Sequence, residues 1–301
     1  MSIPLFKVFM PPSAPSLVEK VLNSGYLSES KYTGQFTKLF SEYIENSHTL
    51  LVNSCTSALH LAYILSGVDS QSEVISTPLT AIASNLPIKY LNAKIVWADV
   101  EATTGMISPR SVKEKITPKT KAVLVLHKDG DLAALEDLIN IVRPMGIKVI
   151  VDAAHSLGAQ INKRPVGTLA DFTCFSFQAI KQLSTGDGGA LACLNEQDYW
   201  HARKLKWFGV DKALKGIANP WYKDVKSIGY KYDLMEVNSA IGIAQMEHIR
   251  DLINAAFDNG CFYTEELENI SGLQLIKRRL IDRPSFWVYT FVVEGRQNLI
   301  E

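Results

Sequence analysis

The stretch KVIVDAAH occupies residues 148–155 and places an acidic residue, Asp152, directly after a short apolar run. A second apolar run, AVLVL, occupies residues 122–126. Such runs are typical of strands that are buried on both faces of a parallel sheet. A helical pattern at residues 132–142 separates the two runs. This part of the chain therefore predicts a βαβ unit.

The same alternation extends outward along the chain. Further strands are expected at residues 50–53, 74–76, 95–98, 172–177 and 190–194, and further helices at residues 14–24, 36–44 and 56–66. Strands that alternate with helices form right-handed crossovers, so we expect an α/β fold with a mostly parallel sheet covered on both faces. Ligands of such sheets bind at the carboxyl ends of the strands.

The pattern changes after Asp198. Aromatic and basic side chains are dense between Trp200 and Tyr232, which suits an interface, although these aromatic residues could also pack inside their own subunit. One long helix is expected at residues 236–256. Strand-like patterns return at residues 273–293. We therefore expect a large domain over residues 1–254 and a small C-terminal domain over residues 255–301. The chain stops within what reads as a first helical turn, so we expect the small domain to be incomplete.

Composition excludes several classes of protein. Of 301 residues, 47% are hydrophobic and 21% are charged, which argues against disorder. Lys and Arg number 31, as do Asp and Glu, and this balance argues against nucleic acid or an anionic membrane as a partner. No apolar run approaches the roughly 18 residues of a membrane span. Cys55, Cys174, Cys193 and Cys261 form no motif for a metal or a disulfide framework, which favours the cytoplasm.

Two strand ends carry polar residues suited to a ligand. Residues 53–58 read NSCTSA, and free N–H groups at the start of the following helix favour a phosphate. The alternative is that Ser54 or Thr56 is only an N-cap. At the second strand end, Asp152 needs a partner to offset the cost of burying its charge. The alternative there is a cap or a buried hydrogen-bond acceptor.

The third strand end reads FSFQAIK at residues 175–181 and leads into the glycine-rich turn TGDGG at residues 185–189. An amine in an apolar pocket is destabilised as a cation and becomes a nucleophile, although Lys181 could also be an ordinary loop lysine. The three features together match pyridoxal 5′-phosphate (PLP). This cofactor needs a lysine for a Schiff base, an acid beside its pyridine nitrogen and a phosphate site.

These motifs, in this order, resemble the sugar aminotransferases of the DegT/DnrJ/EryC1/StrS family, which have the aspartate-aminotransferase fold (PLP fold type I). The resemblance runs from Ile3 to Glu301 and includes TPLTAIASN at residues 77–85 and GYKY at residues 229–232. It implies a PLP-dependent transaminase that moves an amino group from glutamate to a nucleotide-linked keto-sugar. It also implies a place in the biosynthesis of amino sugars and polysaccharides.

The resemblance further implies the roles of individual residues. Lys181 is implied to form the Schiff base and then to shuttle the proton, and Asp152 to pair with the pyridine nitrogen. His155 is implied to lie against the cofactor ring or its 3′ oxygen, although a lone histidine can equally be a core residue. The phosphate is implied to bind Cys55, Thr56, Ser57 and the hydroxyl of Ser176.

Several positions depart from the family pattern. Cys55 stands where many members have glycine, and Ala81 where many have an aromatic residue that stacks on the cofactor. In the family's Gly-x-Asn-x-Arg segment, Lys231 replaces the asparagine and Asp233 the arginine. This segment is implied to reach the partner subunit's cofactor in a homodimer. Lys231 could bind the phosphate there as a point charge, whereas Asp233 could not.

Two alternatives to the transaminase stay open at this point. Sugar dehydratases related to the family use the same cofactor but replace the Schiff-base lysine with histidine, and the presence of Lys181 argues against them. A cofactor-binding or regulatory relative without catalysis would be consistent with the changes at Ala81 and Asp233.

Overall fold

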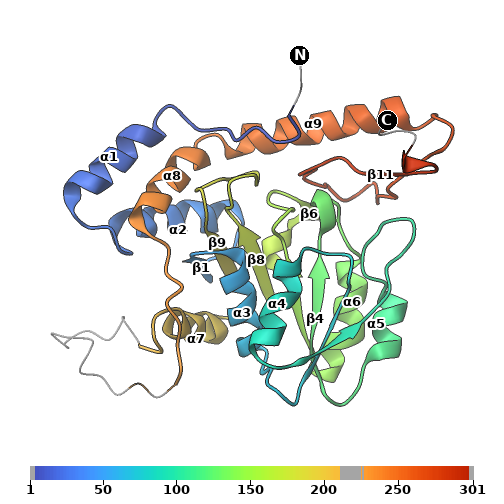
Figure 1. Ribbon diagram of the computed structural model, residues 1–301, viewed down its shortest axis with the longest axis horizontal. Helices are drawn as coiled ribbons and strands as arrows, with labels where there is room; N and C mark the ends of the chain where they lie inside the picture. Colours follow the sequence, from blue (N-terminus) through green and yellow to red (C-terminus); the bar gives the residue numbers. More distant parts are fainter. Residues whose placement is uncertain (1–3, 211–224, 226, 298–301) are drawn as a thin grey trace.

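The computed structural model describes residues 4–210, 225 and 227–297. Its centre is a seven-stranded sheet in the order β1-β9-β8-β5-β4-β2-β3 (Figure 1). The strands are β1 (Thr49–Val52), β2 (Glu73–Ser76), β3 (Lys94–Trp97), β4 (Thr120–Leu126), β5 (Lys148–Asp152), β8 (Phe172–Ser176) and β9 (Gly189–Cys193). Strand β9 runs antiparallel to both of its neighbours, and the remaining pairs are parallel. The expected mostly parallel sheet is confirmed.

Helices cover both faces of this sheet. They are α1 (Ala14–Ser24), α2 (Lys31–Tyr43), α3 (Cys55–Leu65), α4 (Ile82–Tyr90), α5 (Pro109–Lys115), α6 (Leu135–Val142), α7 (Glu196–Lys206), α8 (Glu236–Met246) and α9 (Ile249–Leu267). Alternate residues of a strand point to opposite faces, so β4 contributes to two separate cores. Val123 and Val125 pack in a cluster with α2 and α6, whereas Ala122 and Leu124 pack in a cluster with α3, α4 and α7.

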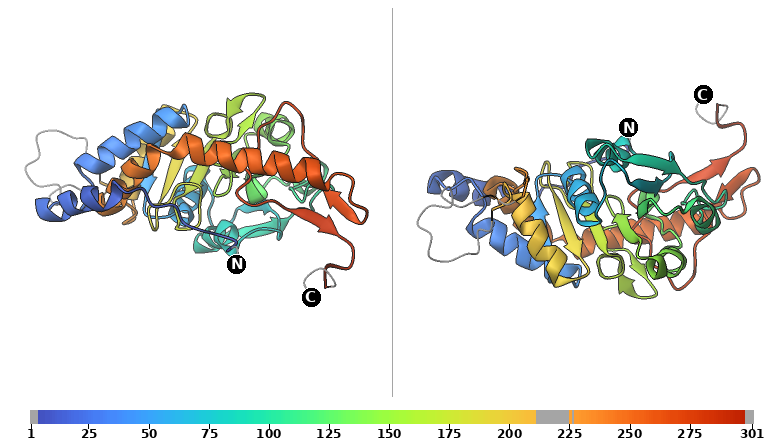
Figure 2. Two further views of the ribbon diagram at one scale, coloured as in Figure 1. Left: turned by 90° about the horizontal axis from the view of Figure 1, so that it is seen from above. Right: turned by 90° about the horizontal axis from the view of Figure 1, so that it is seen from below.

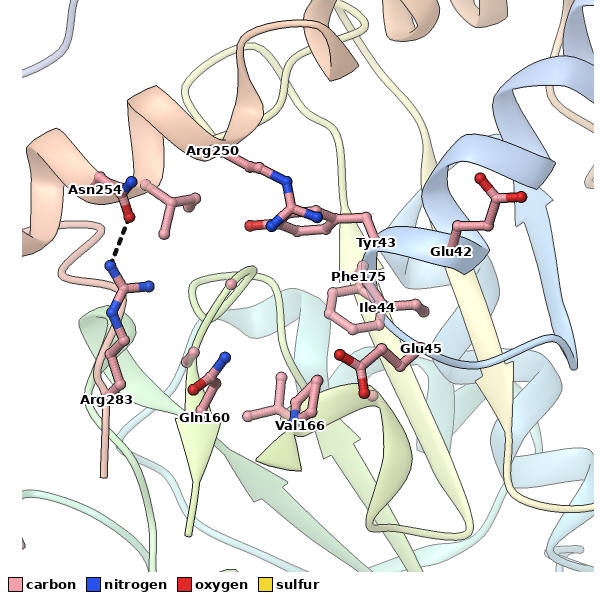
Figure 3. Close-up of a pocket in the computed structure, with 15 residues that line it drawn as sticks. Glu42, Tyr43, Ile44, Glu45, Gln160, Val166, Phe175, Arg250, Asn254 and Arg283 are labelled. Carbon is pink, nitrogen blue, oxygen red and sulfur yellow. Dashed lines mark hydrogen bonds between the residues drawn. The ribbon is translucent and has the colours of Figure 1, made fainter. Parts of the chain in front are cut away.

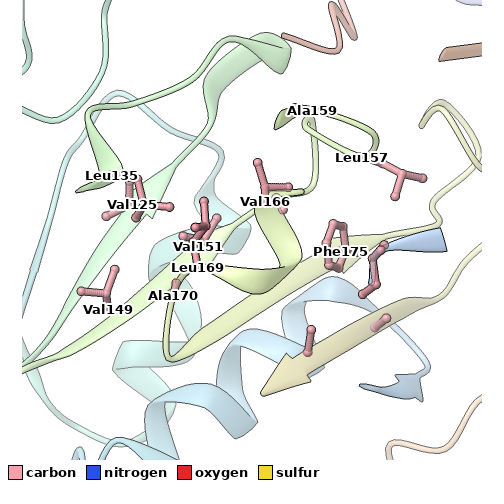
Figure 4. Packing of buried hydrophobic residues seen from close by; sticks show 14 of the residues in the cluster. Val125, Leu135, Val149, Val151, Leu157, Ala159, Val166, Leu169, Ala170 and Phe175 are labelled. Atoms are coloured by element: carbon pink, nitrogen blue, oxygen red, sulfur yellow. The ribbon is translucent and has the colours of Figure 1, made fainter. Parts of the chain in front are cut away.

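The first of these clusters is the larger, and Figure 4 shows part of it. Val149 and Val151 of β5 lie in it beside Phe175 of β8, and all three are at most 1% exposed. This shared packing helps to fix the register between β5 and β8. The two polar residues that end these strands, Asp152 and Ser176, are therefore held at one edge of the sheet.

The segment after the sheet differs from the expectation in one respect. The single helix expected at residues 236–256 is wrong, because α8 ends at Met246 and α9 begins at Ile249. Helix α9 then continues without a break past residue 255 to Leu267. Its apolar residues Ile249 and Ile253 are buried in the larger cluster, whereas its second half leads to an antiparallel pair, β10 (Leu273–Leu275) and β11 (Phe291–Val293).

The N-terminal segment runs along the molecule beside α9 (Figure 2). It is tied down by Gln245 of α8, whose side-chain amide donates a 2.6 Å hydrogen bond to the carbonyl of Phe9. A short antiparallel pair, β6 (Gln160–Ile161) and β7 (Arg164–Pro165), lies apart from the main sheet. Within the described part of the chain, no helix has both the length and the apolar character needed to cross a membrane.

Candidate active site

The carboxyl ends of β1, β8 and β5 meet at one edge of the sheet, with Gly189 between them. Gly189 pairs with Ser176 across β8 and β9, and a Cβ atom on it would lie only 2.6 Å from the backbone nitrogen of Cys55. Only glycine permits so close an approach of the two backbones. The start of α3 and the end of β8 are consequently brought together, and with them Thr56 and Ser176.

The N-terminus of α3 is capped in part and free in part. Ser54 is the N-cap, and its hydroxyl accepts a 3.1 Å hydrogen bond from the backbone N–H of Ser57. The hydroxyl of Ser57 donates to Asn53 at 2.7 Å. Among the described residues, the N–H groups of Cys55 and Thr56 have no acceptor. Two free N–H groups at the positive end of a helix suit a phosphate, so this helix end combines a cap with two donors that an anion could use.

Asp152 is 3% exposed, and its carboxylate is held by two hydrogen bonds. One oxygen accepts from the hydroxyl of Ser84 at 2.7 Å and the other from the backbone N–H of Ala154 at 3.0 Å. The thiol sulfur of Cys55 lies 4.0 Å from the second oxygen. Burial raises the pKa of Asp152, while the two hydrogen bonds and the charge of Lys181 lower it. A buried carboxylate that is held in place by hydrogen bonds is suited to pair with the protonated nitrogen of a pyridine ring.

Lys181 lies in the loop after β8 and is half-buried. Burial lowers its pKa, and the charges of Asp152, Cys55 and Asp129 act in the opposite direction. A lysine amine with a lowered pKa is more often neutral and hence more nucleophilic. Its Nζ atom lies 3.8 Å from the centre of the Trp287 ring. The structure therefore brings the three predicted features, the α3 N-terminus, Asp152 and Lys181, to one place.

His155 also lies in this group and is held as the neutral form. Burial, followed by the charges of Lys181 and Lys128, lowers its pKa to about 3. Its Nδ1 atom accepts a 3.2 Å hydrogen bond from the backbone N–H of Asp129, which leaves the proton on Nε2. The imidazole is stacked on Trp287, with 3.9 Å between the ring centres and 16° between the planes.

Two residues of this site were not identified from the sequence. Ser84 lies in α4 and faces Asp152, but a serine within a helix pattern carries no signal for such a contact. Trp287 lies between β10 and β11, more than 100 residues after Lys181. Only its large aromatic side chain in a strand-like segment could have drawn attention to it.

Cys55 lies in the site beside Asp152, whereas the other positions that depart from the family pattern have less direct links to it. Lys231 is paired within its own chain, with Nζ 2.6 Å from a carboxylate oxygen of Asp233 and 3.7 Å from the centre of the Trp207 ring. Ala81 is exposed at the start of α4. Asp233 is buried at 8% exposure. Trp221 and Tyr222, part of the aromatic segment that suggested an interface, lie outside the described residues.

Two cavities of similar size need to be distinguished. A cavity of about 170 Å³ is lined by Lys181, Trp287 and Phe6, and it adjoins the cluster described above. Another of about 180 Å³ lies between α2, α9 and the segments at residues 158–160 and 165–167, and its charged lining residues are Arg250, Arg283, Glu42 and Glu45 (Figure 3). The second cavity contains none of the predicted site residues, and its four charged residues balance. The first is the better candidate for chemistry.

Comparison with known proteins gives a consistent result. The model of the DegT/DnrJ/EryC1/StrS aminotransferase family matches residues 13–301. The spore coat polysaccharide biosynthesis protein SpsC of Bacillus subtilis is 32% identical over 275 residues, which cover 88% of this chain and 71% of SpsC. GDP-perosamine synthase of Escherichia coli O157:H7 is 28% identical over 301 residues, which cover 99% of this chain and 80% of the synthase.

A solved structure extends the similarity to three dimensions. The sugar aminotransferase CalS13 from Micromonospora echinospora matches with a TM-score of 0.94 and 31% identity, over 99% of this chain and 82% of CalS13. The predicted PLP fold type I is thereby confirmed.

Proposed function

The chain belongs to the DegT/DnrJ/EryC1/StrS aminotransferase family, whose members are PLP-dependent sugar aminotransferases, and we propose that it transfers an amino group from glutamate to a nucleotide-linked keto-sugar. One observation carries the proposal: Lys181, Asp152 and the free N–H groups of α3 meet at one edge of the sheet. The dehydratase alternative is not favoured, because the lysine is present.

The chain's own groups divide the work at this site. When bound, PLP supplies an electron-accepting ring that stabilises the negative charge formed as the substrate loses a proton. Lys181 would attach the cofactor covalently and carry the proton. Asp152 would keep the pyridine nitrogen positively charged, because its carboxylate is fixed by Ser84 and Ala154. His155 would donate a hydrogen bond from its Nε2–H to the 3′ oxygen on the pyridine ring of the cofactor.

The phosphate would be held by groups that the fold has already placed. The free N–H groups of Cys55 and Thr56 and the half-buried hydroxyl of Ser176 are the donors in this proposal. Ser57 would act through its position in the cap, since its N–H and hydroxyl are both engaged.

We extend the proposal to a homodimer with shared active sites. Several large apolar residues are exposed to solvent, among them Tyr26, Ile82 and Ile228, whose exposed fractions are 75%, 78% and 82%. Exposed apolar surface is typical of an interface. Lys231 would leave Asp233 and reach the phosphate of the partner subunit. A monomer in sedimentation at low micromolar concentration that binds PLP normally would rule out this part.

The domain division and location complete the proposal. We place the start of the small domain at residue 255 within α9, between Ile253, which is buried in the larger cluster, and Gly260, which lies against Phe286. The four free cysteines, of which Cys55, Cys174 and Cys193 are buried, suit a reducing cytoplasm.

The direct test combines a spectrum with a substrate screen. Protein loaded with PLP is mixed with glutamate, and the cofactor's absorbance is followed while 2-oxoglutarate is measured. Nucleotide-linked keto-sugars are then added, and the product is examined for a new amino group by mass spectrometry. A product that has lost oxygen without gaining nitrogen would favour the dehydratase. A spectrum that never responds to any amino acid would favour a non-catalytic relative.

A further inference from the structure

Trp287 has no role in the mechanism given above, yet it contacts several groups of the site. Its ring centre lies 3.8 Å from Nζ of Lys181 and 3.9 Å from the ring centre of His155. Its indole N–H donates a 2.8 Å hydrogen bond to the carbonyl of Ile180, the residue before the lysine. Phe6 of the N-terminal segment stacks on the same indole at 5.2 Å and 22°. One side chain therefore touches the reactive lysine, the loop that carries it and the neighbouring histidine.

The backbone around Trp287 is fixed by the large domain. The N–H of Ser285 donates to the carbonyl of Gly130 at 2.9 Å, and that of Val288 donates to the carbonyl of Asp129 at 3.2 Å. A Cβ atom on Gly130 would lie 2.5 Å from the nitrogen of Trp287, so only glycine allows this approach. The hydroxyl of Ser285 donates to the carbonyl of His155 at 2.9 Å. The segment that carries the indole is thus anchored to the loops that follow β4 and β5.

We propose that Trp287 is a positioning residue that holds the Lys181 ammonium against its π face and fixes the ring of His155 by stacking. The proposal rests on the proposed function, because the position of Lys181 matters to catalysis only if this lysine is the reactive one. It also gives the site an aromatic surface that Ala81 does not supply.

The physical effect on Lys181 has a definite sign. A cation over an indole face is stabilised, most strongly where water is excluded, so Trp287 raises the pKa of Lys181 relative to an aliphatic neighbour. Asp152, Asp129 and Cys55 act in the same direction, and burial acts against all of them. His155 is neutral and contributes no charge. Lys7 is a second lysine that lines the same cavity.

The test compares two substitutions that separate the π face from the bulk of the side chain. Trp287→Leu keeps an apolar side chain and removes the π face, whereas Trp287→Phe keeps a smaller π face. The pKa of Lys181 is measured in cofactor-free protein by labelling with trace acetic anhydride at a series of pH values, with peptide mass spectrometry. We expect Trp287→Leu to lower this pKa by about 0.4–1.5 units and Trp287→Phe by clearly less.

A matched control is Trp97→Leu, the same substitution at a 48% exposed tryptophan on the edge strand β3. It should leave the pKa of Lys181 unchanged. An unchanged or raised pKa in Trp287→Leu would overturn the proposal, since water entry would then outweigh any cation–π contact. If circular dichroism shows that the leucine variant does not fold, Trp287→Met serves in its place with the same expectation.

The readout needs neither cofactor nor substrate. A failure to find transaminase activity would therefore leave this result standing, and a failure here would leave the proposed reaction standing. A second signature comes from the holoprotein, because PLP bound beside Trp287 should quench its fluorescence. Trp287→Phe should remove most of the quenching, while Trp97→Leu should preserve it. Equal quenching in wild type and Trp287→Phe would also contradict the proposal.

Discussion

The site has two walls of different construction. The inner wall is the sheet edge, where Asp152 and Ser84 are 3% and 1% exposed and are joined by a hydrogen bond. The outer wall is Trp287 with Phe6, two half-buried aromatic side chains from opposite ends of the chain. The inner wall is fixed by strands and their hydrogen bonds, whereas the outer wall is assembled by packing.

This difference teaches how the two walls should respond to mutation. Charged groups in a buried setting interact strongly and tolerate little change, whereas aromatic stacking at a half-exposed position contributes about 1 kcal/mol. We therefore expect steep losses of activity from the inner wall and graded losses from the outer wall. A large effect at the outer wall, or a small one at the inner wall, would break the distinction.

The largest expected effect belongs to Lys181→Ala. Turnover should fall to background, because no other described amine lies beside Asp152, and PLP should bind only non-covalently. Borohydride reduction followed by peptide mapping should attach the cofactor to Lys181 in the wild type and to nothing in the variant. Lys7→Ala is the control, since Lys7 lines the same cavity on the N-terminal segment. A label on any lysine other than Lys181 in the wild type would refute the assignment.

The next effect belongs to Asp152→Asn. An amide cannot hold a positive charge on the pyridine nitrogen as a carboxylate does. If about two pKa units of support are lost, at about 1.4 kcal/mol each, kcat should fall on the order of a hundredfold. Steady-state kinetics at saturating PLP measures this, with circular dichroism to verify the fold. A kcat near that of the wild type would remove Asp152 from the mechanism.

Ser84→Ala should have a smaller effect on activity than Asp152→Asn, because it removes only one hydrogen bond of the inner wall. The hydroxyl of Ser84 stabilises the ionised form of Asp152, so its removal should raise the pKa of Asp152 further above its usual value. In the proposed mechanism activity needs the carboxylate, and the acidic limb of the pH profile should accordingly move to higher pH. Loss of one hydrogen bond to a charged group, about 1.5 kcal/mol, corresponds to roughly a tenfold loss of activity on that limb.

Two companion variants make the Ser84 result interpretable. Ser84→Thr keeps the hydroxyl and should restore the acidic limb. Thr80→Ala removes a hydroxyl that lies 2.7 Å from that of Ser84 and is not among the hydrogen-bond donors to the Asp152 carboxylate within the described part of the chain, so it should leave the limb in place. An acidic limb that stays fixed in Ser84→Ala would mean that the hydrogen bond has no bearing on the ionisation of Asp152.

Asp152 of the inner wall and Lys181 were accessible from the sequence because their signals are local. Asp152 and Lys181 each follow an apolar strand, and a parallel sheet collects such strand ends at one edge. The N-cap at Ser54 was likewise visible as a small polar residue before a helix. The structure adds that capping leaves two N–H groups free, a point that spacing alone could not decide.

The outer wall was not accessible, because its contacts join residues far apart in the chain. Trp287 meets His155 and Lys181 only after α9 has carried the chain back over the sheet edge. Ser84 was missed for a similar reason, since its orientation depends on how α4 packs. The helix break at residues 247–248 went unseen because the apolar pattern continues across it.

The smallest expected effect belongs to Phe6→Ala, which tests whether the outer wall is a connected stack. Phe6 is half-buried and offset on the indole at 5.2 Å, so its stacking energy should lie near the low end of the usual 0.5–1.5 kcal/mol. Without it, Trp287 should hold Lys181 less firmly, with a twofold to threefold loss of kcat/KM and a shift in the Lys181 pKa of less than about half a unit. Phe9→Ala is the matched control, because Phe9 packs edge-on against His248 instead. If both variants lose the same activity, the N-terminal segment acts only as a cover over the site. A loss confined to Phe6→Ala, with the lysine pKa moving in the same direction as in Trp287→Leu, would show that Phe6 helps Trp287 to hold Lys181 in place.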